Sequence, residues 1–184
     1  MKHTGDAFMT RKQAFTLVEL LVVIVIIAML SALIVPASER MMHSSRASHC
    51  LGNLRNLGAA LHLYLGDNNN MLPALVMGRE SKDEEDKPSI DTVLIDYVGN
   101  PEVFHCKADN RGLYEKTGSS YLWNSLINGQ NIAALDFMGF IHDGSRIPVI
   151  SDKENFHKFQ DVQVNILYVD GHAAKDIQFV TSEK

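Results

Sequence analysis

The sequence predicts an α+β protein in which one long N-terminal helix packs on a head with a small antiparallel β-sheet. Residues 15–35 form a nearly uninterrupted apolar run, and residues 47–65 continue with apolar side chains at helical spacing. The last third of the chain contains short strand-like segments separated by turn residues. One helix and one head fit a chain of 184 residues, because domains usually contain roughly 100–200 residues.

The apolar run from Phe15 to Val35 is long enough to cross a membrane. It contains one charged residue, Glu19. A helix rises about 1.5 Å per residue, so roughly 20 residues span a hydrocarbon layer of about 30 Å. A carboxylate near the centre of such a layer costs ~2.5–3.5 kcal/mol and usually has a partner or a function. Glu19 is therefore a candidate functional residue, with snorkelling to the membrane surface as the alternative.

The charges before the apolar run predict its orientation. Three bases, Lys2, Arg11 and Lys12, precede it against the single acid Asp6. Because basic residues stay on the cytoplasmic side, we expect a cytoplasmic N-terminus and an exported head. A cleaved secretory signal is the alternative, although its apolar core is usually only about 7–15 residues long.

The start of the chain resembles type IV prepilins and type II secretion pseudopilins. The resemblance rests on residues 11–21, Arg-Lys-Gln-Ala-Phe-Thr-Leu-Val-Glu-Leu-Leu, on the aliphatic run that follows and on Pro36. It implies that a prepilin peptidase removes the leader, residues 1–14, by cutting between Ala14 and Phe15, and then methylates the new amine. It also implies that Glu19 acts in filament assembly. The family usually has Gly where this chain has Ala14.

The helix is expected to continue beyond the membrane. Apolar residues recur every three or four positions at Ala47, Cys50, Leu51, Leu54, Leu57, Leu61, Tyr64 and Leu65. Arg46, Asn53, Arg55, Asn56 and His62 fall largely on other faces. The predicted parts are a transmembrane or filament-core helix at 15–35, an amphipathic continuation at 36–66 and a head at 67–184. Pro36 predicts a kink, and Gly52 and Gly58 are expected to loosen the helix.

A second resemblance narrows the family. The stretch Cys50–Gly58 and the ending Asn165–His172 look like a group of pseudopilin-like proteins abundant in planctomycete-related bacteria. That group carries a processing-associated His…Asp-Gly element, which would correspond here to His157, Asp170 and Gly171. The spacer of twelve residues between His157 and Asp170 is longer than the usual nine.

Within the head, turn and strand signals predict a small sheet. Residues 79–88 carry mixed charges and end in Pro, which predicts an exposed loop. Ser89 is expected to cap a short helix that contains Val93, Leu94 and Tyr97. Strands are predicted at 120–126, 146–151, 165–169 and 173–180, with a tight turn at Asp170-Gly171.

The two cysteines, Cys50 and Cys106, allow one disulfide if the head is exported. Such a bridge would tie the long helix to the head and stabilise it by roughly 2–4 kcal/mol. The alternative is two small buried hydrophobic residues. We expect the disulfide.

Metal binding is only weakly indicated. The acidic and histidine residues His142, Asp143, Asp152, His157, Asp170 and His172 have the chemistry of ligands but no compact zinc spacing. Because major pseudopilins often hold calcium in a head loop, Asp143, Asp152 and Asp170 are weak candidates for calcium ligands. No other cofactor is expected.

The expected function is structural rather than enzymatic. The partners implied by the resemblance are the prepilin peptidase, other pilin-like subunits, the inner-membrane assembly machinery and membrane lipid. A net charge of −5 gives no broad attraction to nucleic acid. The protein is expected in the inner membrane, with its head in the periplasm, and then in a pseudopilus or pilus-like fibre. The alternative is a membrane-anchored extracytoplasmic enzyme or binding protein that uses His and Asp residues of the head.

Overall fold

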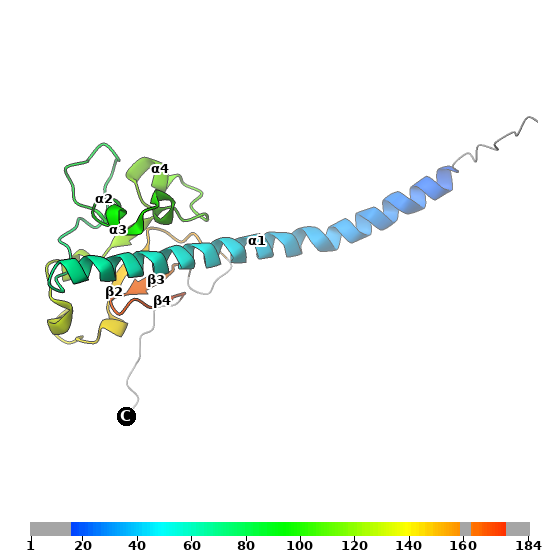
Figure 1. Cartoon of the computed structure of the whole chain (residues 1–184). Coiled ribbons are helices and arrows are strands. Elements are labelled where there is room, and N and C mark those ends of the chain that lie inside the picture. The colour runs from blue at the N-terminus through cyan, green and yellow to red at the C-terminus, as the bar shows by residue number, and fades with distance from the viewer. Residues whose placement is uncertain (1–15, 159–162, 176–184) are drawn as a thin grey trace, which may run out of the picture. The chain divides into compact units, whose positions relative to one another are not determined.

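The computed structural model describes residues 16–158 and 163–175, apart from the side chains at positions 33 and 36. The chain forms two compact units, one ending at Glu39 and the other beginning at Arg40. Helix α1, Leu17–Asp67, contributes to both units. This long N-terminal helix and a small antiparallel sheet confirm the predicted α+β, pilin-like fold (Figure 1).

In the first unit, α1 is apolar on all sides. Its large hydrophobic side chains between Leu17 and Val35 are between 43 and 80 % exposed. This segment is long and apolar enough to cross a membrane. The helix is continuous through Pro36, and the kink expected there stays a prediction.

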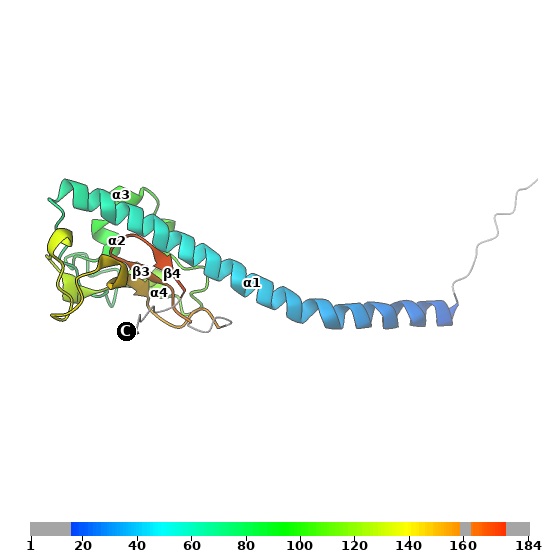
Figure 2. The same cartoon turned by 90° about the horizontal axis from the view of Figure 1, so that it is seen from below.

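In the second unit, α1 buries one face in the head. Of the apolar positions predicted to face inward, Tyr64 is partly buried and the others, Ala47, Cys50, Leu51, Leu54, Leu57, Leu61 and Leu65, are buried. Figures 1 and 2 show this part of the helix lying along the sheet. Gly58 permits the close approach, because a Cβ there would lie 2.9 Å from Leu167 Cδ1 and 3.4 Å from the carbonyl oxygen of Gly171. Gly58 therefore brings the helix onto the sheet, a role that the sequence analysis did not assign to it.

The sheet contains four short antiparallel strands in the order β1-β2-β3-β4. The strands are β1 Tyr121–Trp123, β2 Pro148–Asp152, β3 Ile166–Tyr168 and β4 Ala173–Ala174. The β2–β3 register shifts between Pro148 and Ile150. All four strands lie within or beside predicted segments, and the part of the last prediction beyond residue 175 lies outside the described residues. Gly171 turns the chain between β3 and β4 with a φ of +91°.

Short helices fill the connections around the sheet. The α-helices are α2 Ile90–Val93, α3 Ile95–Val98 and α4 Leu113–Thr117. The 3₁₀ helices are η1 Pro101–Phe104, η2 Ser125–Ile127, η3 Ile132–Ala134 and η4 Gly144–Arg146. Ser89 caps α2 as predicted, and its N–H donates to Thr92 Oγ1 over 2.9 Å. The single helix predicted here is divided at Leu94 into α2 and α3.

Two polar residues predicted to be exposed are buried instead. Arg79, expected in an exposed loop, is 8 % exposed because its guanidinium pairs with Asp91 and donates to the carbonyl oxygen of Lys82. Asn53, expected on an outer face of the helix, is buried because its amide donates to the carbonyl oxygen of His105 over 2.8 Å. Both side chains find distant polar partners, which offset the cost of their burial.

The Arg79–Asp91 pair depends on a glycine. Gly118 has a φ of +89°, and a Cβ there would lie 2.9 Å from Asp91 Cγ. We predict that Gly118→Ala lowers the free energy of unfolding by about 2–4 kcal/mol, because it adds a steric clash to backbone strain. Gly129→Ala is the matched control, since Gly129 also has a positive φ but open space around it. The control should lose only about 1–2 kcal/mol. Equal losses in urea unfolding of the two variants would contradict the steric role of Gly118.

Because Lys153 is partly buried, we predict that the free energy of unfolding depends on pH. Burial lowers its pKa to about 8, against the opposing effect of the Asp91 and Asp109 carboxylates, and its ammonium donates to Thr117 Oγ1 over 2.6 Å. Between about pH 8 and the ordinary lysine pKa of about 10.4, the unfolded chain binds more protons than the folded one. Stability should therefore rise with pH in this window.

Urea unfolding at about pH 7.5 and about pH 9.5 measures this rise. Lys153→Met should remove it, whereas the same change at the exposed Lys107 should leave it in place. A rise that survives in Lys153→Met would show that another group causes it.

Candidate functional site

The first turn of α1 places Glu19 in a reciprocal cap. Glu19 Oε2 accepts from the Thr16 N–H and from Thr16 Oγ1, each over 2.9 Å, and the Glu19 N–H donates to Thr16 Oγ1 over 3.2 Å. This is the capping box that a Thr-x-x-Glu sequence favours at a helix N-terminus. Ala14 and Phe15, the predicted processing site, lie outside the described residues.

The other polar side chain between Leu17 and Val35 is also satisfied within the helix. Ser31 Oγ donates to the carbonyl oxygen of Ile27 over 2.8 Å. Just beyond, Ser38 Oγ donates in the same way to the carbonyl oxygen of Ile34 over 2.9 Å. Such internal bonds leave the hydroxyl groups compatible with an apolar environment, where no water is available to them.

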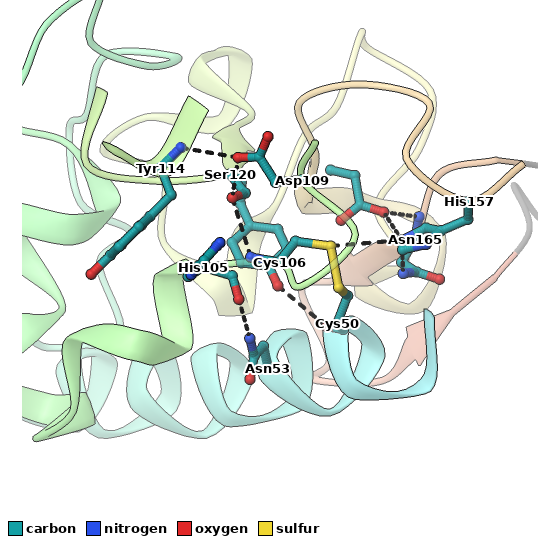
Figure 3. The surroundings of a disulfide bond; sticks show 11 residues. Cys50, Asn53, His105, Cys106, Asp109, Tyr114, Ser120, His157 and Asn165 are labelled. Carbon is teal, nitrogen blue, oxygen red and sulfur yellow. Dashed lines mark hydrogen bonds and ion pairs between the residues drawn. A yellow bond between two sulfur atoms is a disulfide. The ribbon is translucent and has the colours of Figure 1, made fainter. Parts of the chain in front are cut away.

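A disulfide links α1 to the head. Cys50 on α1 and Cys106, which follows η1, are bonded and fully buried (Figure 3). The Cys106 N–H donates to Ser120 Oγ over 3.1 Å, and that hydroxyl donates to Asp109 Oδ2 over 2.8 Å. The segment that carries Cys106 is thus held in place by hydrogen bonds as well as by the covalent link.

Beside the disulfide lies a buried polar cluster of Asp152, His157 and Asn165. His157 Nε2 is 3.0 Å from Asp152 Oδ2, 2.7 Å from Asn165 Nδ2 and 4.0 Å from Cys106 Sγ. Asp152 Oδ2 also accepts from the backbone N–H of Asn165 over 2.6 Å. Burial raises the pKa of Asp152, against the opposing hydrogen bonds from His157 and Asn165. The carboxylate and the imidazole therefore contact each other within the head, away from water.

His157 and Asp170, both named in the predicted family element, have different contacts in the structure. His157 contacts Asp152 and Asn165, whereas Asp170 pairs with His172, whose Nδ1 lies 2.6 Å from Asp170 Oδ1. The His172 ring also stacks on Tyr168 at a centroid distance of 4.3 Å. Asp170 and Gly171 therefore shape the turn between β3 and β4, and His157 belongs to the cluster beside the disulfide.

The three aspartates considered for calcium occupy different settings. Asp143 caps η4 by accepting from the Ser145 N–H, Asp152 is buried, and Asp170 pairs with His172. Within residues 16–158 and 163–175, these three carboxylates do not form a group with their oxygens close enough for one ion. Calcium binding stays a prediction.

The sequence analysis missed two functional groupings for different reasons. The Thr16–Glu19 box was visible as a capping motif, but Glu19 was interpreted only through its charge. Asp152 and His157 were named as possible metal ligands, but Asn165 was not, because Asp152 and Asn165 meet only when β2 and β3 pair. Sequence spacing alone does not bring these residues to His157.

Comparison with known families supports the interpretation of the N-terminus. Residues 9–35 match the family model described as the prokaryotic N-terminal methylation motif. This match covers 27 of the 184 residues and includes Ala14, Phe15 and Glu19. No curated protein and no solved structure matches the chain. The motif is the prepilin-type cleavage and methylation motif, and it supports the resemblance of this N-terminal segment to prepilins and pseudopilins.

Proposed function

We propose that this chain is a non-enzymatic structural subunit, inserted in the membrane as a precursor and assembled through its N-terminal helix into a type II secretion pseudopilus or a type IV pilus-like fibre. The observation that carries the proposal is the combination of the methylation motif at residues 9–35 with an apolar helix whose side chains are exposed on every face. Such a helix needs an apolar environment around it.

Two environments satisfy this requirement in turn. Before assembly, membrane lipid surrounds the segment from Leu17 to Val35, which fits single-pass anchoring. In the fibre, the equivalent helices of neighbouring subunits replace the lipid. Helix association in lipid depends on packing and on polar contacts rather than on hydrophobic transfer, so a separate energy-coupled machine supplies the work of extraction.

Glu19 gives the assembly its register. In the single chain its carboxylate accepts two hydrogen bonds from Thr16, yet the side chain stays exposed. Cleavage before Phe15 creates a positively charged amine one turn away from this carboxylate. In a bundle of parallel helices, the Glu19 carboxylate of one subunit pairs with the amine of its neighbour, and this pairing compensates for the removal of both charges from water.

The head lies on the exported side in this proposal. Lys2, Arg11 and Lys12 hold the N-terminus in the cytoplasm. The Cys50–Cys106 disulfide suits the oxidising side of the membrane. The proposed partners are a prepilin peptidase and methyltransferase, other pilin-like subunits, the inner-membrane assembly machinery and membrane lipid.

Co-expression with a prepilin peptidase tests the processing step. The intact mass of the membrane fraction should fall by the mass of residues 1–14 and rise by one methyl group, and fragmentation should place that methyl on the Phe15 amine. Ala14→Gly should be cut at least as completely as the parent chain, whereas the bulky Ala14→Trp should stay uncut. A parent chain that keeps its first fourteen residues in the presence of the active peptidase contradicts the proposal.

A pair of variants separates the charge of Glu19 from its capping role. Glu19→Gln keeps a side chain that fits the capping box but removes the charge. We predict that this variant is inserted and cleaved normally. Its incorporation into fibres should fall at least roughly tenfold below that of the parent chain, since the amine of the neighbouring subunit loses its partner.

Thr16→Ala provides the matched control, because it removes both hydrogen bonds of the Thr16 hydroxyl and keeps the Glu19 carboxylate. It should assemble at a level near that of the parent chain, measured as the amount of subunit in sheared fibres. The reverse result, with Glu19→Gln assembled and Thr16→Ala excluded, would assign Glu19 to helix capping alone.

A further inference from the structure

Three potential metal ligands converge in the interior of the head. The sulfur atoms of Cys50 and Cys106 and a ring nitrogen of His157 all lie within 4.8 Å of one another, and all three residues are buried. Figure 3 shows the disulfide rising from α1, with a dashed line from the Cys106 sulfur to His157 beside it. These residues come from three separate segments, α1, the chain after η1 and the chain after β2, so only the folded head assembles the group.

Asp152 lies next to His157 but outside the group of three whose ligand atoms are within 4.8 Å of one another, so it would have to move toward the sulfurs to supply a fourth ligand. Its Oδ2 lies 3.0 Å from His157 Nε2, and the two side chains are 0 % and 1 % exposed. Two thiolates, one imidazole and one carboxylate are donors that zinc prefers. With zinc bound, such a set has the same net charge of −1 as the common site with three cysteines and one histidine.

The same cluster contains buried polar atoms without partners. Asp152 Oδ1, His157 Nδ1 and Asn165 Oδ1 are inaccessible and have no hydrogen-bond partner among the described residues. An unsatisfied buried polar atom costs roughly 1–3 kcal/mol, so three of them around one imidazole need an explanation. None of the three is an atom that faces the sulfurs, so they show that the cluster is polar and incompletely paired, whereas the proposed ligand set rests on the sulfur and Nε2 positions.

We propose that reduction of the Cys50–Cys106 disulfide converts this cluster into a zinc site with Cys50, Cys106, His157 and Asp152 as ligands. A dithiol reductant delivers two electrons and two protons to the disulfide and becomes a disulfide itself. The two cysteine thiols then release their protons as they bind the cation. Zinc and the disulfide exclude each other, because two sulfurs bonded together are not available as thiolates.

The required movement is small. Tetrahedral zinc with Zn–S bonds of about 2.3 Å and Zn–N bonds of about 2.0–2.1 Å places two sulfurs about 3.8 Å apart and a sulfur and a nitrogen about 3.5 Å apart. The sulfurs therefore separate once their bond is broken. Cys106 Sγ and His157 Nε2, now 4.0 Å apart, approach by roughly half an ångström. Zinc at His157 Nε2 also displaces the Asn165 amide, whose nitrogen now lies 2.7 Å from that ring nitrogen.

The consequence is a cross-link that survives reduction. In the oxidised chain the disulfide ties α1 to the segment after η1. In the reduced chain zinc would join the same two cysteines and add His157 and Asp152 to the link. This inference concerns the head and does not depend on the proposed function.

Metal binding by the full-length chain in detergent tests the proposal. Oxidised and dithiol-reduced protein are each desalted under anaerobic conditions, mixed with zinc chloride or cobalt chloride, and analysed for bound metal by mass spectrometry. Reduced protein should retain one zinc per chain and oxidised protein only traces. The cobalt form should show the near-ultraviolet charge-transfer absorption of thiolate ligation.

Variants identify the ligands. Cys50→Ser should abolish binding, and His157→Ala and Asp152→Asn should each weaken it by roughly tenfold or more. His172→Ala and His142→Ala serve as controls, because these histidines lie outside the cluster, and they should bind zinc as the parent does. Zinc should also raise the melting temperature of reduced protein and leave that of oxidised protein unchanged.

Three results would overturn the inference. The first is equal zinc binding by the oxidised and reduced chains. The second is reduced protein that keeps its far-ultraviolet circular dichroism but binds no zinc. The third is undiminished zinc binding by His157→Ala. This result would also identify a reduced chain that has unfolded, because two thiols of a disordered chain would bind metal without the histidine.

Discussion

The structure depends on how one helix covers its apolar side chains. After Arg40, the buried stripe of α1 from Ala47 to Leu65 packs on the sheet, so the chain itself shields these apolar side chains from water. Before Glu39, the side chains from Leu17 to Val35 remain exposed within the chain. Apolar surface on this scale marks a region that another phase or another molecule covers. In the proposed function, membrane lipid covers this apolar surface before assembly and neighbouring helices cover it afterwards.

The head shows how a small domain holds such a helix in place. Its strands are only two to five residues long, so the sheet alone offers little surface for packing. The chain adds the Cys50–Cys106 disulfide, the Asn53 bond to His105 and the close approach at Gly58. The first two attach α1 to the segment at the end of η1, and the third brings it against β3 and the turn that follows. Together they make the second half of the helix part of the domain core and leave the first half outside it.

The periodic spacing of apolar residues and the positions of turn residues predicted most of the fold that could be inferred from the sequence. The spacing from Ala47 to Leu65 identified the buried face of α1, and the turn residues located the strands, because both patterns follow from local geometry. Polar residues with distant partners were less predictable. Arg79 and Asn53 were expected at the surface, because no local sequence pattern indicates that Asp91 and the carbonyl oxygen of His105 are their partners. The environment of His157 likewise depends on the pairing of β2 with β3, which brings Asp152 and Asn165 together.

The central claim is that the exposed face of α1 changes its surroundings from lipid to neighbouring helices. A photoreactive residue in place of Ile26, which is 51 % exposed, tests it most directly in cells that contain an assembly machinery. With an active prepilin peptidase, illumination should yield a ladder of cross-linked subunits, and without it only monomer and lipid adducts. Monomer and lipid adducts alone in both cases would contradict the account.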